Sequence, residues 1–273
     1  MIKTVAIVGS FDDLRSRQVR FLEEAAKIGD VHAWVWPDAA VKRISGKPAK
    51  FPAGERLYIV QSLRFVKSAR IATGSPTADA VPGLDVVKPQ VWAVPEGEMN
   101  DAKRTFGAGL EIEVRTIPET DLIALPPAPP LNSRLARQRK VIVSGCYDWL
   151  HSGHIRFFEE ASGYGDLFVD VGSDANIRML KGKGHPLLGQ DTRLYMVLAV
   201  KHVKQAFVGS GFGWLDAAPE ISRIKPDVYL VNDDGDRPEK REFCEGRGIQ
   251  YVVLKRTPKS GLPSRDSTSL RGF

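Results

Sequence analysis

The chain has 273 residues, which suffice for one large or two ordinary domains, and 42% of them are hydrophobic, as in a globular protein with a packed core. The formal net charge of +6 is spread along the sequence, so we expect an anionic small-molecule partner rather than a nucleic acid. No apolar run is long enough to cross a bilayer, only Cys146 and Cys244 are cysteines, and the N-terminus lacks a signal-peptide layout, which together predict a cytoplasmic protein without a disulfide framework.

The first predicted element is a strand that ends at Gly9, and the stretch after it recurs later in the chain. Shifted by 136 residues, Gly9–Ala25 aligns with Gly145–Ala161, and glycine, aspartate, leucine, serine, arginine, phenylalanine, two glutamates and alanine coincide. With a gap of one residue, Arg56-Leu57-Tyr58 also matches Arg193-Leu194-Tyr195. We therefore predict a tandem duplication of one domain.

A proline-rich segment separates the two copies. Residues 125–139 contain four prolines followed by a basic cluster. Because proline fixes φ and lacks an amide hydrogen, we expect a semi-rigid spacer here. The predicted organisation is therefore a domain over 1–124, a linker over 125–139 and a second domain over 140–273.

Strands and helices alternate in the second copy. The apolar patterns predict strands at 141–143, 167–171, 206–208, 228–231 and 251–254, and helices at 154–163, 191–203 and 215–224. This alternation predicts an α/β fold with two tandem Rossmann-like domains, each a parallel sheet with helices on both faces. Such sheets bind ligands at the carboxyl ends of their strands, where Gly145–Asp148 and 232–234 fall.

Two histidines, His151 and His154, stand where the helix after the first of these strands begins. A helix N-terminus presents free amide hydrogens that attract phosphate, and imidazoles there add further donors. A metal pair is an alternative, but the chain contains neither Cys-x-x-Cys nor His-Glu-x-x-His. Two surface histidines without a function are a second alternative.

From Lys140 to Arg271 the second copy resembles the cytidylyltransferase-like nucleotidylyltransferases. The motifs that carry the resemblance, in the order of the family, are Gly145-Cys146-Tyr147-Asp148, His151-Ser152-Gly153-His154, Leu180-Lys181-Gly182, Arg193 with Tyr195, Asp227–Asp234, and Arg256-Thr257 followed by Ser267-Thr268-Ser269. The chain departs from the family pattern at Asn232, where glycine is common, and in the longer segment 258–266.

The resemblance implies attack of a substrate phosphate on the α-phosphorus of a nucleoside triphosphate, with release of pyrophosphate. The implied catalytic residues are His151, His154, Lys181 and Arg193, the last as a phosphate clamp. The implied nucleotide-binding residues are Gly145, Cys146, Tyr147, Asp148, Gly153, Asp233, Asp234, Arg256, Thr257, Ser267 and Thr268. Lys259 and Arg265 are candidates for the second substrate, and Mg²⁺ is expected as the counterion of the triphosphate rather than in a protein cage. We expect His185 to be a surface or packing residue and Trp214 to pack in the core or in a loop.

The first copy lacks these reactive groups. Arg15 and Gln18 stand at the histidine positions, and Ser45 stands at the position of Lys181. We therefore predict an inactive pseudo-domain that serves as an internal partner of a pseudo-dimer, with a further homo-oligomer left open. The tandem layout resembles ethanolamine-phosphate cytidylyltransferases, but there the first half is the catalytic one.

The function expected from the sequence is transfer of CMP from CTP to a small phosphomonoester, which is a polyol, amino-alcohol or sugar phosphate. One alternative is an ATP-dependent adenylyltransferase of the heptose-phosphate type. A second alternative is a non-catalytic scaffold that binds nucleotides.

Overall fold

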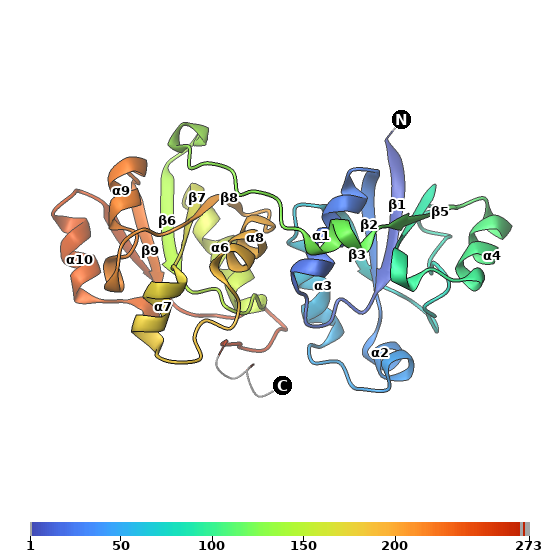
Figure 1. Ribbon diagram of the computed structural model, residues 1–273. Helices are drawn as coiled ribbons and strands as arrows, with labels where there is room; N and C mark the ends of the chain where they lie inside the picture. The colour runs from blue at the N-terminus through green and yellow to red at the C-terminus, as the bar shows by residue number, and fades with distance from the viewer. Residues whose placement is uncertain (1, 268–269, 271–273) are drawn as a thin grey trace. The chain divides into compact units, whose positions relative to one another are not determined.

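A computed structural model describes residues 2–267 and 270 and divides the chain into two compact units, Met1–Leu125 and Pro126–Phe273. Each unit contains one five-stranded sheet with the same strand order, β3-β2-β1-β4-β5 in unit 1 and β8-β7-β6-β9-β10 in unit 2 (Figure 1). All strand pairs are parallel. The predicted fold class, two tandem parallel α/β units, is confirmed.

Unit 1 alternates strands with helices along the chain. Its strands are β1 (Lys3–Gly9), β2 (Gly29–Val35), β3 (Val66–Ile71), β4 (Val91–Pro95) and β5 (Glu113–Ile117). Its helices are α1 (Ser16–Ala26), α2 (Asp38–Ser45), α3 (Ala53–Gln61), α4 (Asp101–Leu110) and α5 (Glu119–Ile123), with a short 3₁₀ turn at Glu96–Glu98.

Unit 2 repeats this plan. Its strands are β6 (Lys140–Gly145), β7 (Asp166–Val171), β8 (Val203–Val208), β9 (Val228–Asn232) and β10 (Gln250–Leu254). Its helices are α6 (Ser152–Ser162), α7 (Asp174–Lys181), α8 (Gln190–Leu198), α9 (Ala218–Ile224) and α10 (Pro238–Glu245). Short 3₁₀ turns lie at Ser133–Leu135, Gly213–Leu215 and Asp233–Gly235.

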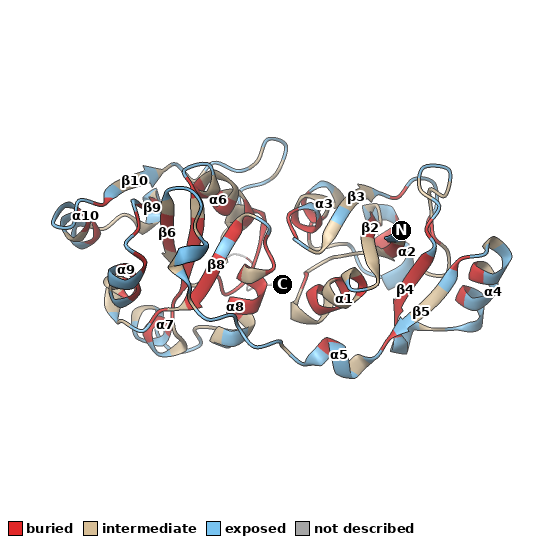
Figure 2. Ribbon diagram, turned by 90° about the horizontal axis from the view of Figure 1, so that it is seen from above, coloured by how far each residue is buried: buried red, intermediate tan, exposed pale blue. Residues whose placement is uncertain are grey.

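The central strands are buried because helices cover the sheet, as the burial colouring shows (Figure 2). Val141, Ile142 and Val143 of β6 are fully buried, and α6 turns Ile155 and Phe158 inward. Because helices cover both faces of a parallel sheet, its strands appear as continuous apolar runs in the sequence. The strands could therefore be predicted from these apolar runs.

Some element boundaries differ from those predicted. Helix α6 begins at Ser152 rather than His154 because the Nδ1 atom of His151 accepts the amide hydrogen of Gly153 at 3.1 Å and caps the helix. Helix α8 ends at Leu198 rather than 203 because β8 starts at Val203. Among the described residues, no helix combines the length and the apolar character that a membrane span requires.

The end of the predicted linker contacts unit 2. The amide of Asn132 donates to Oε1 of Gln205 at 2.9 Å, and Nε2 of Gln205 donates to the carbonyl of Pro130 at 2.7 Å. The amide of Arg137 donates to Asp166 at 2.6 Å. Residues 130–138 are therefore fixed against the sheet of unit 2 rather than spaced away from it.

Candidate nucleotide site

A cavity of about 360 Å³ opens in unit 2 at the carboxyl ends of β6 and β9. These two strands are adjacent in the sheet, and the chain leaves them in opposite directions, so their ends diverge and leave room for a ligand. The lining includes the following residues predicted from the sequence: Gly145, Cys146, Tyr147, Asp148, His154, Lys181, Asp234, Arg256 and Ser267. Five separate segments of the chain thus meet at one place.

The two histidines lie against each other at the start of α6. Their ring centroids are 3.9 Å apart, and Nε2 of His151 lies 3.5 Å from Oγ of Ser267. His151 is fully buried, and burial together with Arg256 and Arg265 lowers its pKa to about 3. Burial and the neighbouring His151 also lower the pKa of His154 well below its usual value.

Both imidazoles are therefore neutral near pH 7. Since Nδ1 of His151 accepts the amide hydrogen of Gly153, its neutral ring carries the proton on Nε2. This Nε2–H lies next to Oγ of Ser267, a residue that lines the cavity.

The turn between β6 and α6 is held in a strained conformation. Tyr147 has a φ of 53°, in the left-handed region that side chains other than glycine rarely adopt. Its ring meets His154 edge to face, with 5.3 Å between the ring centroids. A Cβ atom at Gly145 would lie 2.8 Å from this ring, so only glycine fits there. The turn thereby packs the ring of Tyr147 against the imidazole of His154.

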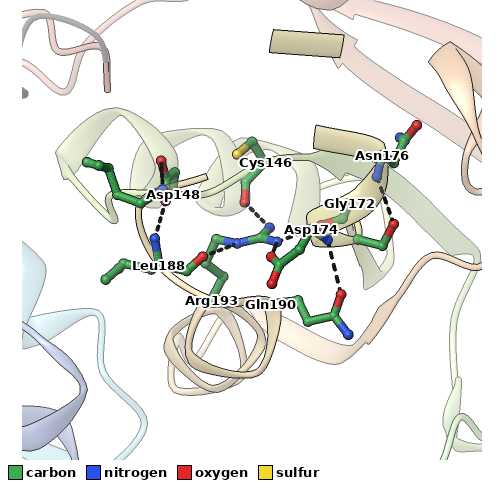
Figure 3. Close-up of polar contacts among 10 residues, drawn as sticks. Cys146, Asp148, Gly172, Asp174, Asn176, Leu188, Gln190 and Arg193 are labelled. Carbon is green, nitrogen blue, oxygen red and sulfur yellow. Dashed lines mark hydrogen bonds and ion pairs between the residues drawn. The ribbon is translucent and has the colours of Figure 1, made fainter. Parts of the chain in front are cut away.

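Arg193 does not line the cavity, and its guanidinium is instead bonded within the protein (Figure 3). It is fully buried, and its guanidinium donates to the carbonyls of Leu188 at 2.9 Å, Cys146 at 2.7 Å and Gly172 at 2.8 Å, and to Asp174 at 2.6 Å. The expected phosphate clamp is not supported by this geometry, because these bonds occupy the guanidinium inside the protein. Arg193 instead joins the ends of β6 and β7 to the loop before α8.

Asp148 fixes the same loop from the other side. Its carboxylate accepts the amide hydrogens of Leu187 and Leu188, each at 2.8 Å (Figure 3). Unit 1 has the equivalents of the Asp148 and Arg193 contacts. Asp12 accepts the amide hydrogens of Lys50 and Phe51, and Arg56 donates to the carbonyl of Phe51 at 2.8 Å. Arg56 also donates to the carbonyl of Ser10 and to Asp38, and it is fully buried. Since unit 1 has no histidine pair, these contacts belong to the scaffold.

Two cations reach the cavity from other elements. Lys181 is exposed at the end of α7, and Arg256 follows β10. Arg256 donates to Asp234 at 2.6 Å and to the carbonyl of Arg265 at 3.0 Å. Asp234 therefore orients this arginine at the cavity wall, while Asp233 accepts the amide of Asp234 and does not line the cavity.

The other predicted residues lie beside the cavity or away from it. Gly153, Thr257 and Arg265 line a small neighbouring depression. Lys259 is ion-paired with Glu159 at 2.7 Å and lines neither space, so its role toward a second substrate stays a prediction without a supporting contact. Thr268 lies outside the described residues.

Sequence reasoning missed several residues of the lining. His185 was expected to be a surface or packing residue and Trp214 a core or loop packing residue, yet both line the cavity. Arg237 stacks over Trp214 with 4.4 Å from its guanidinium carbon to the ring centroid. Asp216 and the buried Lys240 complete the inner wall.

Under this inner wall lies a buried pair of carboxyl groups. Asp170 of β7 is fully buried, and neither of its oxygens has a hydrogen-bond partner in the described part of the chain. Burial and the adjacent Asp216 raise the pKa of Asp170 well above its usual value, and burial also raises the pKa of Asp216. Asp216 accepts a hydrogen bond from Nδ2 of Asn176 at 2.8 Å, which leaves Asp170 as the member of the pair that binds a proton.

The site contains no protein cage for a metal. Across residues 2–267 and 270, no group of three or more histidine, cysteine, aspartate or glutamate side chains could hold one. The carboxylate of Asp148, which is closest to the turn, is already bound to backbone amides.

Comparison with known proteins places the chain in a family. A family model described as Cytidylyltransferase-like matches residues 142–264. The FAD synthase of Aciduliprofundum boonei is 34% identical over 119 residues, which are 42% of this chain and 76% of that protein. The chain belongs to the cytidylyltransferase-like family. The superfamily of nucleotidyltransferases is thereby confirmed, whereas specificity for CTP is not.

Two proteins named Bifunctional protein HldE are also similar. That of Geobacter sulfurreducens is 44% identical over 134 residues, 43% of this chain and 27% of the relative. That of Desulfatibacillum aliphaticivorans is 29% identical over 211 residues, 74% of this chain and 40% of the relative. The chain thus spans well under half the length of these two relatives.

Proposed function

We propose that unit 2 transfers a nucleotidyl group from a nucleoside triphosphate to a phosphomonoester and releases pyrophosphate. The observation that carries this proposal is the meeting of His154, Lys181 and Arg256 with the N-terminus of α6 around one cavity. Neutral imidazoles and two cations provide donors for a phosphate chain but no nucleophile. Direct transfer between two phosphates needs this kind of site, because positioning and charge neutralisation dominate its catalysis.

In the proposed reaction, an oxygen of the acceptor phosphate attacks the α-phosphorus of the triphosphate. The bond from the α-phosphorus to the bridging oxygen of the β-phosphate breaks, and pyrophosphate leaves with the electron pair. The donors at α6 and Lys181 would stabilise the negative charge that develops on the phosphate oxygens. Mg²⁺ fits this site as a counterion that enters with the triphosphate, since the described residues offer no cage for it.

We infer that ATP is the nucleotide rather than CTP. FAD synthase, a relative of which the chain covers 76%, is named for a product that contains an adenylyl group. The acceptor in this proposal is a small phosphomonoester, whose phosphate supplies the attacking oxygen.

Pyrophosphate release by the full chain tests the proposal. ATP, CTP, GTP and UTP are each combined with Mg²⁺ and with glycerol phosphate, sugar phosphates, ethanolamine phosphate or flavin mononucleotide. We expect turnover with ATP and at least one acceptor, and a loss of about 10²–10³-fold in His154→Asn. Gln18→Asn, at the equivalent position of unit 1, serves as the matched control and should keep full activity.

Two outcomes overturn parts of the proposal. Turnover with CTP but not with ATP rejects adenylyl transfer and restores the cytidylyl alternative. Binding of triphosphates without pyrophosphate release from any combination rejects the enzyme and leaves a nucleotide-binding scaffold.

A further inference from the structure

The inner wall of the unit 2 cavity has an equivalent in unit 1, and the two differ in one ion pair. Shifted by 137 residues and without a gap between them, Asp79 aligns with Asp216 and Lys103 aligns with Lys240. In unit 1 this pair is closed, with 2.7 Å between Nζ of Lys103 and Oδ1 of Asp79. In unit 2, Lys240 forms no ion pair or hydrogen bond with Asp216 or with any other described residue. Both copies therefore keep the lysine and the aspartate, but the pair is open in unit 2.

Different side chains anchor the aspartate in the two copies. In unit 1, Oδ1 of Asp79 also accepts a hydrogen bond from Nδ2 of Asn100 at 2.9 Å. In unit 2, Oδ2 of Asp216 accepts a hydrogen bond from Nδ2 of the fully buried Asn176 at 2.8 Å. Asn176 is itself fixed, because its Oδ1 accepts the amide hydrogen of Gly213 at 2.8 Å. Helix α7, which carries Asn176, therefore holds the carboxylate that the lysine holds in unit 1.

The ammonium group of Lys240 is buried without a bonded partner. The residue is 5% exposed, and Nζ lies 5.5 Å from the ring centroid of Tyr229. Burial lowers the pKa of Lys240, and the carboxylate of Asp216 opposes this shift, so the two charges lie near each other. Nζ still retains accessible surface, unlike the sealed carboxyl oxygens of Asp170. Because a buried ammonium without an acceptor opposes folding and this side chain borders the cavity, a bound ligand can supply the missing acceptor.

A donor and an acceptor that lie near each other suit a hydroxyl group. Asp216 also borders the cavity, and a carboxylate oxygen can accept more than one hydrogen bond. An alcohol can donate its proton to Asp216 and accept a hydrogen bond from Lys240. An ammonium group of a ligand would be repelled by Lys240, and a carboxylate or phosphate group would be repelled by Asp216. The open pair therefore favours uncharged hydroxyl groups over either kind of ion.

We propose that Lys240 and Asp216 form a subsite for hydroxyl groups of a substrate bound in the unit 2 cavity. This inference rests on the transfer reaction proposed above and narrows the chemistry of its substrates. The hydroxyl groups belong either to an acceptor that is a polyol or sugar phosphate or to the ribose of the triphosphate. In both cases the substrate bridges the lysine and the aspartate, which contact each other directly in unit 1.

Isothermal titration of the full chain tests the subsite with pairs of ligands that differ in their hydroxyl groups. Glycerol phosphate and hexose phosphates are compared with propyl phosphate, which lacks free hydroxyls on its carbon chain. Mg²⁺ and α,β-methylene ATP are present in these titrations, so that the acceptor binds without transfer. ATP is compared with 2′-deoxy-ATP in the absence of an acceptor, which tests the ribose.

We expect the ligand with the additional hydroxyls to bind about tenfold more tightly in at least one of these comparisons. Lys240→Met should remove this preference and Asp216→Asn should reduce it, while the affinity for the ligand without the hydroxyls stays nearly the same. Loss of the preference for glycerol or hexose phosphates identifies the acceptor, and loss of the preference for ATP identifies the ribose. Lys103→Met, in the closed pair of unit 1, is the matched control and should keep the preference. Circular dichroism establishes that each variant is folded.

Three results overturn the inference. The first is that no ligand binds more tightly than its counterpart with fewer hydroxyls. The second is that the preference persists unchanged in Lys240→Met. The third is that Lys240→Met weakens both members of a pair equally, which would show that the lysine acts only through its charge. The transfer reaction fails separately, because a chain that shows the preference but releases no pyrophosphate keeps the subsite and is not the proposed enzyme.

Discussion

Replacement of Arg193 by lysine distinguishes a scaffold role from a phosphate-binding role for this side chain. The guanidinium bonds three backbone carbonyls and Asp174 from a fully buried position. A lysine ammonium cannot reach all of these acceptors at once, and each buried acceptor left without a donor costs about 1–3 kcal/mol. Because a buried ion pair is disturbed as well, we expect a loss of about 3–5 kcal/mol in the unfolding free energy.

Urea denaturation followed by circular dichroism measures this loss, and pyrophosphate release is assayed in parallel. Arg56→Lys is the matched variant, since Arg56 makes the equivalent bonds in unit 1. Both variants should lower the stability of their own unit by similar amounts. The scaffold role is refuted if Arg193→Lys unfolds at the original urea concentration yet loses activity by about 10²-fold or more.

Three further predictions concern the buried polar groups and the histidines. Asp170→Asn should raise the unfolding free energy of unit 2 by about 1 kcal/mol at pH 7 and by less at pH 4, as measured by urea titration. The reason is that the pKa of Asp170 is raised in the folded state, so the original chain loses stability as the pH rises and this carboxyl group ionises. A variant less stable than the original chain at pH 7 would contradict this. The pKa of His151 is lowered from 6.5 to about 3 in the folded protein. The unfolding free energy should therefore fall by about 1.4 kcal/mol per pH unit as the pH drops from 6.5 towards 3. His151→Gln should remove this dependence on pH. Restoring histidines with Arg15→His and Gln18→His should create no pyrophosphate release in a chain that also carries His154→Asn, because unit 1 still has Ser45 where unit 2 has Lys181.

The sheet could be predicted from the sequence because its strands are short apolar runs. Helices α7 and α10 were missed because each has only eight residues, and α10 is mostly polar. In α10 only Lys240 and Cys244 are buried, which gives no helical period of apolar residues. Lys240, which α10 carries to the cavity, was therefore missed as well, whereas Lys181 at the end of α7 was identified by its motif.

The spacing of His151 and His154 predicted a phosphate site because helix starts have a recognisable local pattern. The position of Arg193 was not predictable from local pattern, since its partners lie in the segments of Cys146 and Gly172 as well as in the adjacent loop. One signal was present in the sequence. Arg56-Leu57-Tyr58 repeats Arg193-Leu194-Tyr195 in a copy that has lost both histidines, which indicates a role in the shared scaffold.

The two copies together separate the residues that build the cavity from those that distinguish its use. The positions that both copies keep hold the turn, the loop and the inner wall; with the unit 2 residue second, they are Phe11 and Tyr147, Asp12 and Asp148, Arg56 and Arg193, and Lys103 and Lys240. The positions that differ are those proposed to bind phosphate, where unit 1 has Gln18 and Ser45 in place of His154 and Lys181. Because the inner wall is kept in the copy that lacks these side chains, its packing does not depend on them.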